Sequence, residues 1–188
     1  RQRGLFGELT FLNTLLKESS NHIESIMSWT GPSGSNQDFS NKLSAVEVKT
    51  SKATNPTVKI ASELQLDWTV LESLFLYVIH LDEISNGIDT LCKLIEEIKQ
   101  KISYQNELLR LFEEKLDLVG IRFGEETLYD DTGYIIRSKK GYEVKEGFPA
   151  LINSTINNDA IHNVKYQIDL IACEPFEFEN QLIISKMI

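Results

Sequence analysis

An apolar run at residues 74–81, interrupted only by Tyr77 and His80, constrains the fold of this chain more than any other segment. The surrounding residues 70–81 are rich in β-branched and aromatic types, which predicts a buried central strand. The run is far shorter than the roughly 18 apolar residues that suggest a membrane span, so we expect no membrane partner. A buried strand needs other elements packed on it, which predicts a layered globular domain.

Periodic apolar residues predict the other elements. Leucines recur at i, i+4, i+7 and i+11 within residues 4–16 and form one helical stripe. Further helices are predicted over residues 61–69, 88–102 and 106–119. Strands are predicted over residues 23–29, 38–39, 44–50, 58–60 and 164–173, and a hairpin over residues 134–137 and 142–144 around Ser138-Lys139-Lys140-Gly141. This order predicts a mixed α/β fold with α+β character and a largely antiparallel start.

Composition excludes several classes of function. The 188 residues fit one domain, or one domain with an appendage. A net charge of −9 excludes binding to nucleic acid through the whole surface and leaves open a local patch assisted by metal ions. Two cysteines and three histidines, in no ligand-like spacing, argue against disulfides or zinc and favour the cytoplasm. The first residue is Arg1 rather than methionine, so we expect the natural start of the chain to be missing.

The candidate site centres on the predicted strand at residues 44–50. Side chains alternate between the two faces of a strand, so Glu47 and Lys49 point the same way, about 6.6 Å apart. The neighbouring valines point into the core. Asp38 lies nine residues before Glu47, after a hairpin-like turn, and pairing of the two strands would bring these acids together. Glu8 lies at the border of the leucine stripe, where it can reach over the edge of the sheet.

These residue types suit metal-assisted phosphate chemistry. Two carboxylate oxygens, waters and a substrate phosphate oxygen are ligands that Mg²⁺ prefers. The ion would act as a Lewis acid on the phosphate and lower the pKa of its bound water. Lys49 would orient that water or neutralise charge that develops on phosphorus. Glu8 would be a further ligand, directly or through water.

Seven short segments occur in the order expected of a known superfamily: GLFGEL (4–9), WTGP (29–32), DF (38–39), EVKT (47–50), SELQLD (62–67), GFP (147–149) and VKYQIDL (164–170). With them the chain resembles the PD-(D/E)xK phosphodiesterase superfamily. More narrowly, it resembles a family encoded beside bacterial restriction-modification and phage-defence genes. The resemblance implies a restriction-endonuclease-like core at residues 1–87, built on a central mixed sheet flanked by helices. Residues 88–188 would add a C-terminal helical and β-hairpin extension, packed on the core as one domain.

The resemblance also implies a function, namely Mg²⁺-dependent hydrolysis of DNA phosphodiester bonds in restriction or phage defence, with Mn²⁺ able to substitute. Glu8, Asp38 and Glu47 would surround the metal ion. Lys49 would be the catalytic lysine, and Gln65 would position the substrate. DNA is the expected partner, together with a second copy of the chain or other subunits of a defence system.

The chain departs from the superfamily pattern at two places. Gln37 takes the place of proline before Asp38, which is common in the superfamily. Some branches carry a glutamine and a tyrosine four residues apart on the following helix, whereas here Gln65 is followed by Thr69. Superfamily members often use the backbone carbonyl between the acid and the lysine as a metal ligand, which here is that of Val48.

Basic residues gather in two places despite the negative net charge. Lysines near an acidic metal centre would hold backbone phosphates without reading sequence, although solvated loop lysines would produce the same pattern. The first cluster contains Lys42, Lys49, Lys52 and Lys59, and the second contains Arg137, Lys139, Lys140 and Lys145.

Three alternatives remain open. Glu143 and Lys145 form a second Glu-x-Lys triplet on a predicted strand, with Asp130 and Asp131 upstream. The acidic net charge motivates a non-catalytic nuclease-like subunit or a protein-interaction module of a defence complex. A nuclease that acts on RNA or on structured DNA is the third alternative.

Overall fold

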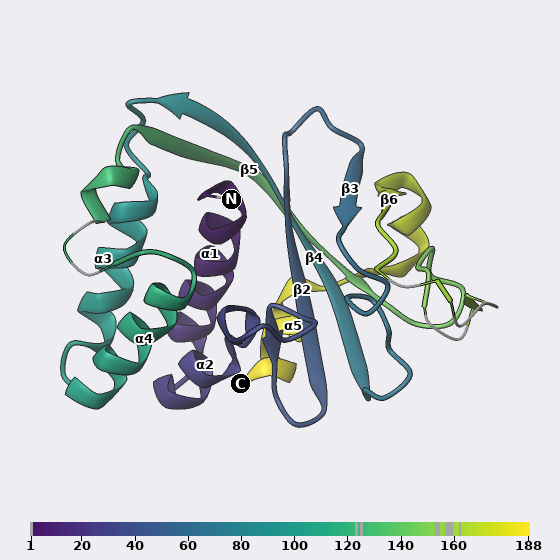
Figure 1. The fold of residues 1–188 in the computed structure, drawn as a ribbon, viewed down its shortest axis with the longest axis horizontal. Helices are drawn as coiled ribbons and strands as arrows, with labels where there is room; N and C mark the ends of the chain where they lie inside the picture. Colours follow the sequence, from purple (N-terminus) through teal and green to yellow (C-terminus); the bar gives the residue numbers. More distant parts are fainter. Residues whose placement is uncertain (1, 123, 125, 153–154, 157–159, 162) are drawn as a thin grey trace.

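A five-stranded mixed sheet forms the centre of the structure, a computed structural model that describes residues 2–122, 124, 126–152, 155–156, 160–161 and 163–188 (Figure 1). Its strand order is β1-β2-β4-β5-β7. Strands β2 and β4 are parallel, and the other neighbours are antiparallel. The bounds are β1 Phe39–Ser40, β2 Ser44–Ser51, β4 Ser73–Ser85, β5 Thr132–Glu143 and β7 Glu177–Phe178. This topology confirms the predicted mixed α/β class and fits a restriction-endonuclease-like core.

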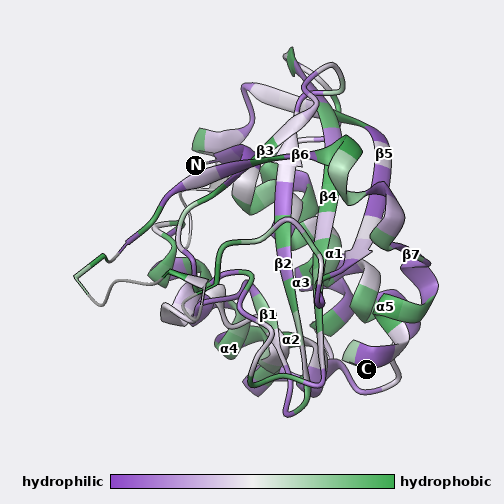
Figure 2. Cartoon of the chain, turned by 90° about the vertical axis from the view of Figure 1, so that its right-hand side faces the viewer, coloured by the Kyte–Doolittle hydropathy of each residue, from purple (hydrophilic) through white to green (hydrophobic). Residues whose placement is uncertain are grey.

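The sheet is covered on both faces. Helices form one covering layer, and a small antiparallel sheet of β3 (Thr57–Ile60) and β6 (Tyr166–Asp169) lies on the other side (Figure 1). Side chains of β4 alternate between these layers, as the buried run predicted, and Figure 2 shows hydrophobic residues along this strand. The helical layer contains α1 Gln2–Glu18, α2 His22–Ser28, α3 Leu91–Ile102, α4 Asn106–Leu118 and α5 Asn180–Met187.

Most predicted elements are confirmed with small shifts at their ends. These are the helices at residues 4–16, 88–102 and 106–119, and the strands at residues 38–39, 44–50, 58–60 and 70–81. Every helix in the described part of the chain is too short or too polar to cross a membrane.

Strand β2 and helix α1 carry the candidate site because they pack closely. Val46 and Val48 of β2 point into the helical layer, and Glu47 points to the opposite face. That face is also covered, so only 1% of Glu47 is exposed. A Cβ atom on Gly7 of α1 would overlap the Thr50 methyl group. Glycine at this position therefore lets α1 lie directly on β2.

The strand predicted at residues 23–29 is wrong, because this segment forms the helix α2. Ile23, Ile26 and Met27 follow the i, i+3, i+4 spacing of a helix. The Asn21 side chain accepts a hydrogen bond from the backbone N–H of Glu24 and caps the first turn.

The helix predicted at residues 61–69 is also wrong, because these residues form turns. Gln65 Oε1 accepts a hydrogen bond from the Ala61 N–H at 2.8 Å. The Glu63 carboxylate accepts one from the Val164 N–H, also at 2.8 Å. Both side chains thus hold the segment in turns, one through a nearby and one through a distant backbone N–H.

Two predictions near the C-terminus need correction. The predicted β-hairpin is one continuous strand, β5, in which residues 138–141 pair with residues 77–80 of β4. Pairing with the long strand β4 keeps residues 138–141 extended, although their sequence is typical of a turn. The strand predicted at residues 164–173 ends early, because Asp169 caps the following 3₁₀ helix η4 (Leu170–Phe176) through the Ile171 N–H.

Candidate functional site

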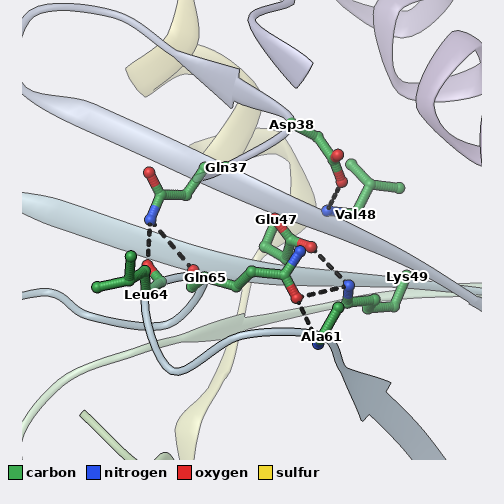
Figure 3. A network of polar contacts seen from close by, with 8 residues as sticks. All are labelled: Gln37, Asp38, Glu47, Val48, Lys49, Ala61, Leu64 and Gln65. Atoms are coloured by element: carbon green, nitrogen blue, oxygen red, sulfur yellow. Dashed lines mark hydrogen bonds and ion pairs between the residues drawn. The ribbon is translucent and has the colours of Figure 1, made fainter. Parts of the chain in front are cut away.

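All five predicted site residues line one cavity of about 450 Å³ between α1, β2 and β3. They come from separate parts of the sequence: Glu8 from α1, Asp38 from the residue before β1, Glu47 and Lys49 from β2, and Gln65 from the turns after β3. Figure 3 shows the last four around the middle of β2. The fold therefore brings together the residues that the sequence selected.

Antiparallel pairing of β1 with β2 places Asp38. Phe39 lies opposite Val46, so the residue before Phe39 lies alongside the Glu47–Val48 stretch, as the hairpin-like turn predicted. The Asp38 carboxylate accepts a hydrogen bond from the Val48 N–H through Oδ2 at 2.9 Å (Figure 3). The aspartate is thus fixed to the strand that carries the other acid and the lysine.

The Lys49 ammonium lies between an acid and an amide. Its Nζ is 2.6 Å from Glu47 Oε1 and donates a hydrogen bond to Gln65 Oε1 at 3.1 Å (Figure 3). The same Gln65 oxygen accepts from the Ala61 N–H, so the amide is anchored from its other side. Gln65 contacts the lysine although the helix expected to carry it does not form.

Glu8 is held by Trp29, which was not among the predicted site residues. The indole N–H of Trp29 donates to Glu8 Oε2 at 2.9 Å, and Trp29 itself is fully buried at 0% exposure. A buried indole N–H needs an acceptor, so a tryptophan expected in the core is the signal that could have indicated a polar partner.

Burial shifts the pKa values of all three acids upward, and repulsion by Asp38 adds to the shift for Glu8 and Glu47. Loss of solvation, with the nearby Asp38 as the second cause, raises the pKa of Glu47 to about 8 and that of Glu8 to about 7. Burial also raises the pKa of Asp38, opposed by the Lys49 charge and the hydrogen bond from Val48. When all three acids are ionised, three negative charges face the single ammonium of Lys49, so the site attracts additional positive charge.

The donor set fits a hard cation. Both carboxylate oxygens of Glu47 are closed to solvent; Oε1 has only the ion pair with Lys49, and Oε2 has no partner among the described residues. Buried acceptors without partners are uncommon and point to an absent ligand. Asp38 and Glu47 could hold an oxygen-preferring ion together. In the described residues no three His, Cys, Asp or Glu side chains converge closely enough to enclose an ion by themselves.

The alternative Glu-x-Lys triplet is not assembled into a site. Glu143 ends β5, whereas Asp130 and Asp131 precede the start of the same twelve-residue strand. Glu143 pairs with Lys145, and Asp130 accepts a hydrogen bond from Thr90. The upstream acids and the triplet therefore lie at opposite ends of β5.

The two basic clusters also differ in their surroundings. Lys52 and Lys59 of the first cluster line the cavity together with Lys49. In the second cluster, Arg137 pairs with Asp82 at 2.7 Å and Lys140 with Glu177 at 3.2 Å. Only the first cluster thus adds positive charge at the candidate site.

Comparison with known proteins agrees with this geometry. A family described as "Putative PD-(D/E)XK family member (DUF4420)" matches residues 1–171. Neither a search of curated proteins nor one of solved structures gives a match. The matched residues include α1, β1, β2 and the turns that carry Gln65, and they span most of the chain. The chain therefore belongs to this PD-(D/E)XK family.

Proposed function

We propose that this protein is a Mg²⁺-dependent endonuclease that hydrolyses DNA phosphodiester bonds in restriction or phage defence. The observation that carries the proposal is the meeting of Asp38, Glu47 and Lys49 in one cavity. Membership of the PD-(D/E)XK family supports the same chemistry. Cys92 and Cys173 are both buried and, in the described part of the chain, form no disulfide, which agrees with action in the reducing cytoplasm.

Asp38 and Glu47 would hold the metal ion, with the backbone carbonyl of Val48 as a further ligand and Glu8 acting through water. The bound ion would supply Lewis-acid activation of the phosphate and a more acidic water; Mn²⁺ would serve as well as Mg²⁺. Lys49 would neutralise charge that develops on the phosphate during attack. Gln65 restricts the direction of that ammonium because it accepts a hydrogen bond from Nζ.

Basic side chains at the same cavity would bind the nucleic-acid backbone. Arg3, Lys52 and Lys59 line it beyond Lys49, and the two lysines are exposed. Phosphate contacts of this kind fix the position of a strand without reading bases. Such a local patch reconciles DNA binding with a net charge of −9.

We expect the double variant Lys52→Met/Lys59→Met to bind DNA more weakly and with a smaller dependence on salt. Each lost phosphate contact lowers the slope of log K against log salt by about one, so the slope falls by about two. Fluorescence anisotropy of a labelled duplex over a salt series measures this slope. The matched double variant Lys140→Met/Lys145→Met, from the second basic cluster, should retain the wild-type slope. Equal slopes for all three proteins would contradict the assignment of this surface.

The proposed activity is tested by plasmid cleavage in Mg²⁺, in Mn²⁺ and in a chelator. Cutting that requires the ion supports the proposal.

Calorimetry with Mn²⁺ separates the enzyme from the alternative, a non-catalytic subunit or interaction module motivated by the acidic charge. A binding isotherm that Asp38→Ala abolishes favours the enzyme, and no binding to the wild type favours the module. A panel of duplex, single-stranded and branched DNA and RNA identifies the substrate.

Cutting both strands of a duplex needs two sites, so we include a homodimer in the proposal. Sedimentation of the protein with and without DNA would detect it. Other subunits of a defence system are the alternative source of a second site.

A further inference from the structure

A buried lysine outside the cavity contacts the segment that holds two of the acids. Lys115 of α4 is only 8% exposed. Its ammonium donates to the carbonyl oxygen of Trp29 and, at 3.4 Å, to that of Met27. Among the described residues no carboxylate pairs with it. A buried charge is costly unless strong acceptors compensate it, and the carbonyls at the C-terminal end of α2 carry the negative end of the helix dipole.

Residues 29–31, which the lysine anchors, contact both Glu8 and Asp38. The Trp29 indole donates to the Glu8 carboxylate at 2.9 Å. The backbone N–H groups of the next two residues, 30 and 31, both donate to the Asp38 carbonyl oxygen at 2.9 Å. A Cβ on Gly31 would lie 3.3 Å from the Asp38 Cα, so the two backbones are in close contact. A shift of this segment would displace both acids together.

Helix α4 holds the same tryptophan by a second contact. The rings of Phe112 and Trp29 lie with their centroids 6.0 Å apart. Phe112 precedes Lys115 by three residues and lies on the same side of α4. The aromatic ring and the ammonium of one helix therefore fix the indole and the carbonyl of one residue.

We propose that Lys115 is a positioning residue for the metal site, acting through residues 29–31 on Glu8 and Asp38. The inference rests on the proposed function, because it assigns the lysine to the geometry of that site. An apolar residue at this position would leave the carbonyl of the fully buried Trp29 without its Lys115 donor. The segment would then move to find other partners, and Glu8 would lose its fixed orientation.

Lys115→Met is expected to bind Mn²⁺ about 10- to 100-fold more weakly in calorimetry, as is typical when a residue that orients metal ligands is lost. Lys101→Met, a matched change of a partly exposed lysine on α3, should bind as the wild type does. Trp29→Phe removes the indole donor. If Lys115 acts through Trp29, the double variant Lys115→Met/Trp29→Phe should lose less Mn²⁺ affinity than the product of the two single fold-losses. Independent, multiplicative losses would overturn the proposed route.

A second measurement does not depend on the metal. Trp29 and Trp68 are the two tryptophans of the chain, so two indole N–H resonances are expected by NMR. Lys115→Met should shift the Trp29 resonance and leave that of Trp68 in place. Should Lys115→Met fail to fold, Lys115→Gln replaces it and Lys101→Gln becomes its control, with the same measurements of Mn²⁺ affinity and of the indole resonance. Equal Mn²⁺ affinity and an unshifted indole would overturn the role of Lys115, whereas a wild type that binds no Mn²⁺ would overturn the metal site itself.

Discussion

Asp38→Ala and Lys49→Ala are each expected to lower the rate of DNA cleavage in Mg²⁺ by about 10³-fold or more. Asp38 supplies one of the two carboxylates that would hold the ion, and it is tied to β2 by the Val48 N–H. Lys49 supplies the ammonium in the cavity that is closest to the acids. Time courses of plasmid nicking at saturating Mg²⁺ measure both losses.

The two variants should differ in metal binding, which separates their roles. Asp38→Ala is expected to lose the Mn²⁺ isotherm because a ligand is gone. Lys49→Ala is expected to retain it, since an ammonium binds no cation and its removal lowers repulsion toward the ion. Asp130→Ala and Lys145→Ala are the matched controls from the unassembled triplet and should cut at the wild-type rate. Unchanged cutting by both Asp38→Ala and Lys49→Ala would refute the proposed site.

The parts of the site that could be predicted depend on local pattern. Alternation along β2 places Glu47 and Lys49 on one face, and the short connection before it lets β1 pair back and position Asp38. Leucine spacing in α1 puts Glu8 at the border of its buried face. Each inference uses the geometry of one element or one turn, which sequence periodicity reports directly.

The predictions that were wrong, and the contacts that were missed, depend on residues far away in the sequence. The turns around Gln65 replace a helix because Glu63 is held by Val164, 101 residues later. Strand β5 continues through a turn-like sequence because β4 offers a long partner. Lys115 reaches Trp29 from a helix 86 residues further along the chain. Local propensity carries no information about such contacts, and tertiary packing overrides it.

Replacing Glu8 with glutamine is expected to stabilise the metal-free protein at pH 8 by about 1 to 3 kcal/mol. Burial and the neighbouring Asp38 raise the pKa of Glu8 from 4.5 to about 7 in the folded protein. The folded state therefore binds the Glu8 proton more tightly than the unfolded state does. It follows that this group lowers the free energy of unfolding progressively as the pH rises from about 4.5 to about 7. Glutamine keeps an oxygen that can accept from the Trp29 indole and removes the charge.

Urea unfolding in a chelator at a series of pH values measures the difference between Glu8→Gln and the wild type. The two proteins should be about equally stable below pH 4.5, and the difference should open as the pH rises toward 7. Glu114→Gln, an exposed position on α4, serves as the control and should change stability by less than about 0.5 kcal/mol at any pH. Added Mg²⁺ should reverse the order at pH 8, because the wild type gains binding energy that the variant has partly lost. A difference that is independent of pH would mean that Glu8 carries no excess negative charge in the folded protein, and the site would then have no electrostatic need for a cation there.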